Sequence, residues 1–296
     1  MKPNRLASAV ADQIASNASA IGHEETFAEH RARLTREIAE RAPASGRGRL
    51  CLLGAGNAND VDLDALAARF AEIHLCDIDP DAVARAIARV PAPRRPQLVA
   101  HAPLDASGLL DRLEPWMAPS VLPAAEVPDG FVGDAVARVV GALPGPFDVV
   151  VSCSMLTQLQ LVLLQVVGDA NPRFTDLRAA LNRPHVRTLG ALLAPGGVAL
   201  LVTDLTTSEI HPPLIHVDAG ADLAQLMTEL IAAGSIIYVA NPGTLSSEMR
   251  RDPALKQTFA VRYPIGPWLW RNGPTQMLLV YALEIRRNAD AVSEGR

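Results

Sequence analysis

The sequence predicts an α/β fold built on a doubly wound sheet of about seven strands, mostly parallel with an antiparallel C-terminal edge. Short apolar runs alternate five times with stretches whose apolar residues recur at helical spacing. This alternation is typical of a parallel sheet that helices cover on both faces. Two further β-like segments near the C-terminus have no helix between them and predict the antiparallel edge. The arrangement is Rossmann-like, and such sheets bind ligands beyond the carboxyl ends of their strands.

The predicted strands are short apolar runs that end in glycine or in polar residues. Residues 50–53, Leu-Cys-Leu-Leu, are continuously apolar, as expected for a strand buried on both faces of a parallel sheet. The parallel strands are predicted at residues 50–53, 73–76, 97–101, 147–153 and 198–203. Residues 236–239, 259–263 and 277–285 are also β-like, and we assign the last two to the antiparallel edge.

The predicted helices have one apolar face. Leu63, Leu66 and Phe70 follow helical spacing, and Asp79-Pro80 starts another helix, because Asp caps helix N-termini and Pro suits the first helical position. Helices are also predicted at residues 8–42, 131–143, 156–167, 178–193 and 223–231. The segment 156–167 is apolar nearly all round, which predicts deep burial or packing against a partner.

Composition excludes several classes of protein. The formal net charge is −5, so the chain lacks the basic footprint of a dedicated nucleic-acid binder, and no nucleic-acid partner is expected. Cys51, Cys76 and Cys153 show no CxxC spacing and lie in apolar runs, which predicts core thiols in a reducing compartment and no bound metal. No run of about 18 apolar residues and no signal peptide is evident. We therefore expect a cytoplasmic protein without membrane contact.

Glycines and an acidic residue follow the first two predicted strands. Gly54-Ala55-Gly56-Asn57 would bring backbone N–H groups close to a ligand, although an ordinary strand-to-helix turn is the alternative. Asp77 follows the second strand, where a carboxylate suits ribose hydroxyls. The alternative for Asp77 is helix capping, a role that we assign to Asp79.

The third position of the glycine pattern distinguishes a dinucleotide such as NAD from a methionine-containing nucleoside. A dinucleotide fingerprint has a third glycine beneath the pyrophosphate, whereas this chain has Asn59, followed by Asp60. The carboxylate of Asp60 would repel a pyrophosphate but not a methionine ammonium group. An NAD-dependent oxidoreductase remains the alternative to a protein that binds a methionine-containing nucleoside.

Over residues 48–205 the chain resembles the class I S-adenosylmethionine-dependent methyltransferases. The resembling segments, in chain order, are Gly54-Ala55-Gly56, Asp77-Ile78, Leu104-Asp105-Ala106, the strand Phe147 to Ser152, and Leu193-Ala194-Pro195-Gly196-Gly197. Leu52 departs from the family, many members of which carry an acid there. The segment Ser152-Cys153-Ser154-Met155 also differs from the Asn/Asp-Pro-Pro-Tyr/Phe pattern of enzymes that methylate base amino groups.

The resemblance implies S-adenosylmethionine (SAM) as the cofactor and a methyltransferase acting on the oxygen, nitrogen or sulfur of a small molecule. A non-catalytic cofactor-binding protein is a further alternative, and a homodimer is conceivable. From its position alone we expect the helical N-terminal region, residues 1–45, to act as a lid, with a SAM-binding domain over residues 46–296. The cofactor-binding residues that we predict are Gly54, Ala55, Gly56, Asn57, Asp60, Asp77, Ile78, Leu104, Asp105, Ser152 and Cys153.

A base is needed only if the acceptor is a hydroxyl or a protonated amine. We select His211 and Asp204 as catalytic candidates because they follow the fifth predicted strand. Surface or capping roles are the alternative for such histidines. Trp268 and Trp270 would share one face of a strand, where they form either a substrate wall or a packing patch.

Overall fold

The computed structural model of the chain describes residues 5–113, 129–218, 220–237, 240–256, 259–261, 264–273 and 275–289. Its strands are β1 (Gly48–Leu53), β2 (Phe70–Cys76), β3 (Leu98–His101), β4 (Phe147–Cys153), β5 (Leu193–Thr207), β6 (Phe259–Val261), β7 (Ile265–Arg271) and β8 (Met277–Arg287). Within the described residues, eight strands form one sheet in the order β3-β2-β1-β4-β5-β8-β6, and β7 also pairs with β8.

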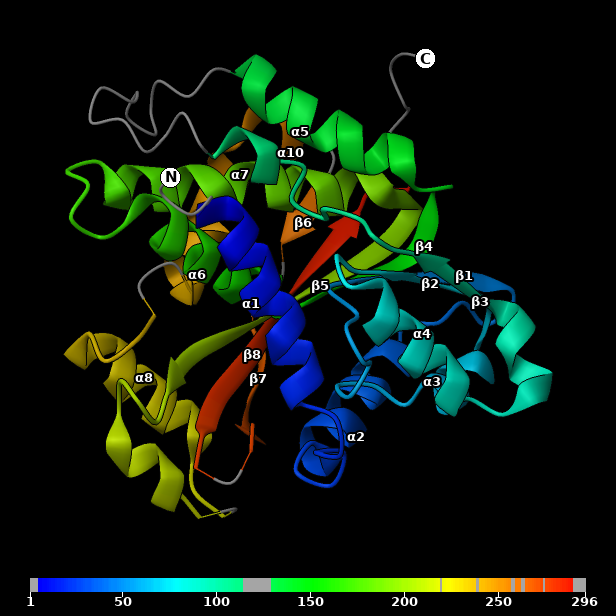
Figure 1. Cartoon of the computed structure of the whole chain (residues 1–296), viewed down its shortest axis with the longest axis horizontal. Coiled ribbons are helices and arrows are strands. Elements are labelled where there is room, and N and C mark those ends of the chain that lie inside the picture. The colour runs from blue at the N-terminus through cyan, green and yellow to red at the C-terminus, as the bar shows by residue number, and fades with distance from the viewer. Residues whose placement is uncertain are drawn as a thin grey trace.

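The first five strands pair in parallel, whereas β8 is antiparallel to β5, and β6 and β7 are antiparallel to β8. The strand order reverses direction along the chain between β1 and β4, which is where such a sheet opens a binding crevice. The predicted fold class, a mostly parallel sheet with an antiparallel C-terminal edge, is thus confirmed (Figure 1).

Alternate residues of each strand feed two cores, one on each face of the sheet. Leu50 and Leu52 pack with α2 (Ala28–Ala39), α3 (Leu63–Ala67) and α4 (Pro80–Arg89). Cys51 and Leu53 face the other core. The helices that contribute to this second core are α5 (Asp129–Ala142), α6 (Met155–Val167), α7 (Phe174–Leu192), α8 (Leu223–Ala233), α9 (Pro242–Arg251) and α10 (Pro253–Lys256).

Two helices next to the predicted site begin at aspartate caps. Asp62 accepts hydrogen bonds from the backbone N–H groups of Asp64 and Ala65 before α3, and Asp79 caps α4 in the same way, with Pro80 at the first helical position. These caps satisfy N–H groups that have no partner inside the helix. The predicted start of the second helix, at Asp79-Pro80, is confirmed.

Several predicted boundaries differ from the structure. Residues 8–42 do not form one helix: α1 (Arg5–Ser19) ends before a turn in which Gly22 has φ +82°, and α2 begins at residue 28. Residues 236 and 237 are not in a strand, and 238–239 lie outside the described residues. The fifth strand is longer than predicted because β8 pairs along most of its length. All three cysteines are buried and free, as expected for core thiols.

α1 stands apart from the two layers of helices and runs across the face seen in Figure 1, in blue. It packs mainly against α6, with a smaller contact to α4. Among the described residues, no helix combines the length and apolar character needed to cross a membrane. The position of α1 closes one side of the site described next.

Candidate functional site

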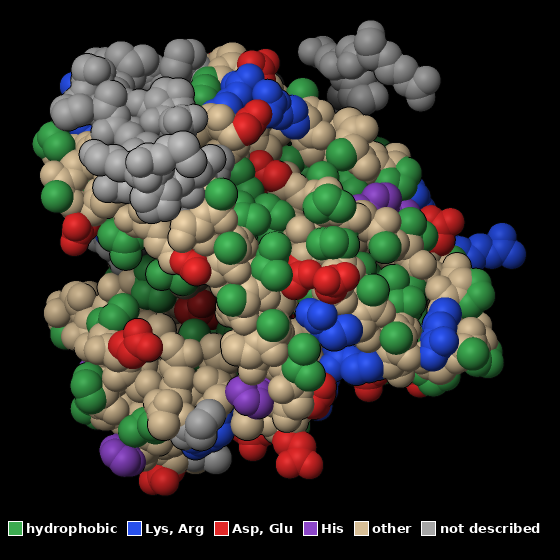
Figure 2. Space-filling model, viewed as in Figure 1, with side chains coloured by type: hydrophobic (Ala, Val, Ile, Leu, Met, Phe, Trp, Pro, Cys, Tyr) green, Lys and Arg blue, Asp and Glu red, His purple; other side chains and the backbone are tan. Residues whose placement is uncertain are grey.

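A cavity of about 200 Å³ lies at the carboxyl ends of β1, β2 and β3, beneath α1. Its walls come from the loops after these strands, from α1, from α6 and from β7. Figure 2 shows this face of the molecule hollowed, with acidic side-chain atoms at the bottom of the hollow. The cavity lies where strand order reverses, so its position agrees with the binding rule for doubly wound sheets.

Most of the predicted cofactor-binding residues are brought together around this cavity. The ones that line it are Gly54, Ala55, Gly56, Asn57, Asp60, Asp77, Ile78, Leu104 and Asp105. Ser152 and Cys153 do not line it. The Ser152 hydroxyl points toward α7 and lies 2.8 Å from His185 Nε2, and Cys153 packs in the core beneath α2 and α3 on the opposite face of the sheet.

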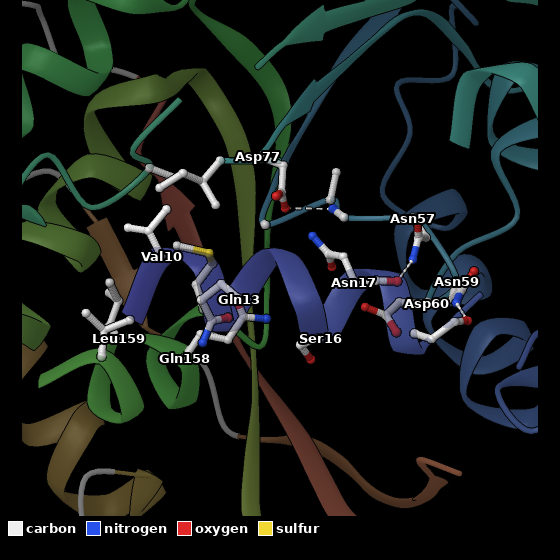
Figure 3. A pocket seen from close by; sticks show the side chains of 18 of the residues that line it. Val10, Gln13, Ser16, Asn17, Asn57, Asn59, Asp60, Asp77, Gln158 and Leu159 are labelled. Carbon is white, nitrogen blue, oxygen red and sulfur yellow. Dashed lines mark hydrogen bonds between the residues drawn. The ribbon is translucent and has the colours of Figure 1, made fainter. Parts of the chain in front are cut away.

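Asp77 connects the glycine loop to the end of β2. One carboxylate oxygen accepts a hydrogen bond from the Gly56 N–H at 2.7 Å, and the other accepts from the Asp79 N–H at 2.9 Å (Figure 3). Burial raises the pKa of Asp77, and these N–H donors oppose the rise. The Asn17 side chain of α1 also lowers the pKa of Asp77 through hydrogen bonding, and the remaining acceptor capacity of the carboxylate suits a ligand hydroxyl.

Gly54 and Gly56 are glycines for different reasons. Both have positive φ, +75° and +47°, which L side chains rarely adopt. A Cβ on Gly54 would lie 2.6 Å from the Met155 sulfur and 3.2 Å from the Cys153 carbonyl oxygen, so packing demands this glycine. A Cβ on Gly56 would approach the Asn17 side chain of α1, at 2.9 Å, beside the cavity. A side chain at Gly56 would therefore press against α1 at the cavity wall.

The carboxylate of Asp105 is engaged by its own loop. It accepts hydrogen bonds from the backbone N–H groups of Ser107 and Leu110, both at 2.9 Å, and from the Ser107 hydroxyl. These bonds order the turn that carries Leu104 and Asp105 into the cavity wall.

Asn57 bridges the glycine loop to α1. Its amide N–H donates to the Asn17 carbonyl at 2.6 Å, and its amide oxygen accepts from Arg85 of α4 at 3.0 Å. Asn59 repeats the pattern, donating to the Ala20 carbonyl at 3.0 Å and accepting from Arg89 at 2.8 Å. The two asparagines thereby tie the last turn of α1 and the residue that follows it to the glycine loop (Figure 3).

Asp60 lines another part of the cavity wall and retains 21 % exposure of its side chain. Burial and the nearby carboxylate of Asp204 raise the pKa of Asp60 to about 7, against an opposing effect of Arg31. His30 Nε2 of α2 lies 3.7 Å from Asp60 Oδ1. Asp60 is therefore poised to change its charge near neutral pH.

The two catalytic candidates are not part of the cavity lining. Asp204 is buried at the end of β5, where its carboxylate accepts from the Ser154 hydroxyl at 3.3 Å and where burial raises its pKa to about 6. It acts on the cavity only through the charge of Asp60. His211 precedes the short helix η5 (Pro212–His216), and its backbone N–H donates to the Thr207 carbonyl at 2.8 Å.

Sequence reasoning did not predict several residues that line the cavity. Trp270 and Asn272 reach it from β7 and the turn that follows, and Gln13 and Asn17 reach it from α1. The N–H of Trp270 is buried and has no hydrogen-bond partner among the described residues. The pairing of two tryptophans on one strand face was the available signal, and it favoured packing over a substrate wall.

No family model and no curated protein matches the chain, but solved structures do. One is the N-methyltransferase NodS from Bradyrhizobium japonicum WM9 in complex with S-adenosyl-L-homocysteine, at 12 % sequence identity over 86 % of each chain and a TM-score of 0.42. Another is magnesium protoporphyrin IX methyltransferase from Synechocystis PCC 6803, at 12 % sequence identity over 90 % of this chain and 84 % of that one and a TM-score of 0.41. A structure from work on the conversion of a disulfide bond into a thioacetal group during echinomycin biosynthesis is 15 % identical in sequence. The match covers 88 % of this chain and 82 % of that one, with a TM-score of 0.45. The chain is similar in fold to methyltransferases of known structure, at TM-scores below 0.5.

Proposed function

We propose that this chain binds S-adenosylmethionine in the cavity beneath α1 and transfers its methyl group to a small-molecule acceptor. The observation that carries the proposal is the 2.7 Å hydrogen bond between Asp77 and the Gly56 N–H, with both residues lining one cavity at the strand ends. A ribose-binding acid and a ligand-cradling loop must meet in this way if they are to hold one adenosyl-amino-acid molecule.

The residues around the cavity suit the parts of this ligand. Asp77 would accept hydrogen bonds from ribose hydroxyls, while Ile78 and Leu104 offer apolar contacts for the adenine ring. Gly56 leaves space that a Cβ would fill, and Asp60 would pair with the ammonium group. Ser152 and Cys153, which lie outside the cavity wall, are not assigned to the ligand.

The same residues argue against a dinucleotide. Asp60 faces into the cavity beside the glycine loop, where a pyrophosphate would meet a second negative charge. The third glycine of a dinucleotide fingerprint lets the helix pack close to the strand beneath the pyrophosphate. Asn59 stands at that position, and its side-chain amide is hydrogen-bonded to the Ala20 carbonyl and to Arg89.

Bound SAM supplies a methyl group already activated by its sulfonium. The protein's contribution would be alignment of the acceptor and exclusion of water, which together can supply several kcal/mol. Trp270, with its unpartnered N–H, and Asn272 are the residues that we assign to the acceptor side of the cavity. A negative net charge of −5 favours a small molecule over nucleic acid.

Calorimetry with SAM, S-adenosylhomocysteine (SAH) and NAD tests the binding part of the proposal. We expect both adenosyl compounds to bind and NAD not to bind. A screen of small hydroxyl, amine and thiol compounds with methyl-labelled SAM then tests transfer. NAD binding without SAH binding would overturn the proposal in favour of an oxidoreductase, whereas SAH binding without transfer to any fraction would favour a cofactor-binding protein.

We also propose that the helical region of residues 1–45 acts as a lid, with Asn57 and Asn59 as its latch. The cavity is walled by α1, and the carbonyls of Asn17 and Ala20 are held by these two amides, which Arg85 and Arg89 fix from α4. Ligand exchange would then require the C-terminal end of α1 to move away from the glycine loop.

The double substitution Asn57→Ala and Asn59→Ala is expected to accelerate SAH release by roughly 30-fold, because it removes two hydrogen bonds that each contribute about 1 kcal/mol. Stopped-flow release of SAH measures this rate, and hydrogen exchange of residues 8–18 is expected to accelerate in parallel. Asn241→Ala is the matched control, since Asn241 caps α9 with the same amide chemistry away from the cavity. An unchanged release rate in the double variant would contradict the latch.

A further inference from the structure

The cavity wall at Asp60 is backed by His30 and three aromatic side chains, Phe27, Trp268 and Trp270. His30 is buried in α2, and its ring stacks on Trp270 with ring centroids 4.3 Å apart. Trp268 donates its indole N–H to His30 Nδ1 at 3.0 Å. Phe27 packs edge-on against Trp270, with ring centroids 5.2 Å apart. Stacking on Trp270 therefore fixes the plane of the His30 ring, and the hydrogen bond from Trp268 fixes the rotation of the ring within that plane.

The contact with Trp268 determines which nitrogen of His30 carries the proton. An indole N–H only donates, so Nδ1 must accept, and the neutral ring carries its proton on Nε2. Burial and the charge of Arg31 lower the pKa of His30 to about 3, so the ring stays neutral across the physiological range. The remaining N–H of His30, on Nε2, faces the carboxylate of Asp60.

We propose that His30 is a positioning residue that Trp268 holds in one tautomer, so that its Nε2–H supports the charged form of Asp60 for a cationic group of the bound ligand. The inference rests on the proposed function for the identity of that ligand. The Nε2–Oδ1 distance is 3.7 Å, longer than a hydrogen bond, and such contacts often tighten only when a ligand is bound.

Other groups around Asp60 have opposing effects on its charge. From β5, the Asp204 carboxylate disfavours a second negative charge, and from α2 the Arg31 guanidinium favours it. Burial adds to the effect of Asp204, and together they raise the pKa of Asp60 to about 7. Without the His30 N–H dipole, we expect this pKa to rise further.

Ligand affinity is expected to depend on pH through the charge of Asp60. A cationic ligand group pairs with deprotonated Asp60, so ligand affinity is full above the pKa of Asp60 and falls as pH drops through it. Binding between about pH 6 and pH 8 would release the Asp60 proton to solvent. Both SAM and SAH carry an ammonium group, so stable SAH is a suitable probe.

The experiment follows the Asp60 carboxyl by NMR in the ligand-free protein with ¹³C-labelled aspartate, using Asp60→Asn to assign the signal. His30→Phe and Trp268→Phe keep aromatic rings in the core but remove the N–H relay. Each is expected to raise the Asp60 midpoint, by less than the roughly one pH unit that losing a full hydrogen bond to a charged group would give, because the 3.7 Å contact in the ligand-free protein is longer than a hydrogen bond. His30→Gln, which retains a donor at this end of the side chain, is expected to restore a midpoint near that of the wild type.

His185→Phe is the matched control. His185 is equally buried, and burial likewise lowers its pKa, to about 4, but it lies on α7 beside Ser152 and not at the cavity. Its replacement perturbs a core histidine without touching Asp60. The Asp60 midpoint is therefore expected to stay where it is in the wild type.

SAH calorimetry at pH 6 to 9 completes the test. In His30→Phe and Trp268→Phe the pH at which affinity falls should move upward with the NMR midpoint, while affinity at pH 9 stays near that of the wild type. An Asp60 midpoint that does not move in either variant would overturn the inference, and a shift in His30→Phe alone would overturn the role of Trp268. If the midpoints shift but the wild type does not bind SAH, the positioning role stands and the proposed function fails.

Discussion

Gly56→Val is expected to abolish SAH binding while leaving the chain folded. Gly56 has φ +47°, and a side chain there would project from the loop toward Asn17 of α1, with its Cβ 2.9 Å from Asn17 Oδ1. Valine would fill the space beside the glycine loop and would also carry the strain of a left-handed conformation, about 1–2 kcal/mol. Calorimetry gives the affinity, and thermal unfolding shows whether the variant is folded.

Gly46→Val is the control that distinguishes the backbone strain of Gly56→Val from the filling of space beside the cavity. Gly46 has φ +66°, lies in the loop before β1 and has no atom within 4 Å of an added Cβ, so the variant keeps the backbone strain but leaves the cavity untouched. We expect a similar loss of stability and an unchanged SAH affinity. If Gly56→Val bound SAH as well as the wild type does, the glycine loop would not be part of the site.

Asp77→Ala is expected to weaken SAH binding by about 10- to 100-fold, because it removes a buried acceptor of charge-assisted hydrogen bonds. Two effects combine in this loss. The ribose hydroxyls lose their partner, and the N–H groups of Gly56 and Asp79 lose the carboxylate that holds the loop in place. Calorimetry with SAH measures the change in affinity.

Asp62→Ala is the control for the structural part of this effect. Asp62 also accepts two backbone N–H groups, those of Asp64 and Ala65, both at 3.0 Å, but it does not line the cavity. Its loss is expected to lower stability by about 1 kcal/mol, as for other helix caps, with SAH affinity preserved. Equal losses of affinity in both variants would remove Asp77 from the ligand site.

The central sheet could be predicted because each of its strands carries its own signal. A run such as Leu50 to Leu53 is buried on both faces, and burial on both faces leaves a continuous apolar pattern that any window of sequence reveals. The helix α4 was predicted from its Asp79 cap and apolar spacing, and α3 from apolar spacing alone, although Phe70, which was counted in that spacing, begins β2. The break between α1 and α2, at the turn that contains Gly22, was missed, since α1 packs against α6 and α4, which lie far along the chain.

The glycine loop and Asp77 could also be placed in advance, because parallel strands end at one edge and their following residues must meet there. What the side chains do at that edge was less predictable. Asn57 reads as a ligand-facing residue in sequence, yet its amide is bonded to α1 and α4. Ser152 points to His185 of α7, and Cys153 points to the core on the other face of the sheet, so neither side chain lines the cavity at the strand ends.

The sequence by itself determined the class of sheet, the edge at which a ligand would bind and the acid and glycines that meet there. Only the tertiary structure decided that α1 covers the cavity, that Trp270 and Asn272 form part of its wall, and that His30 and Asp204 flank Asp60. The reason is physical: periodicity reports which face of an element is buried, but not what it is buried against. Residues as distant in sequence as His30 and Trp268 become neighbours only through strand pairing and helix packing.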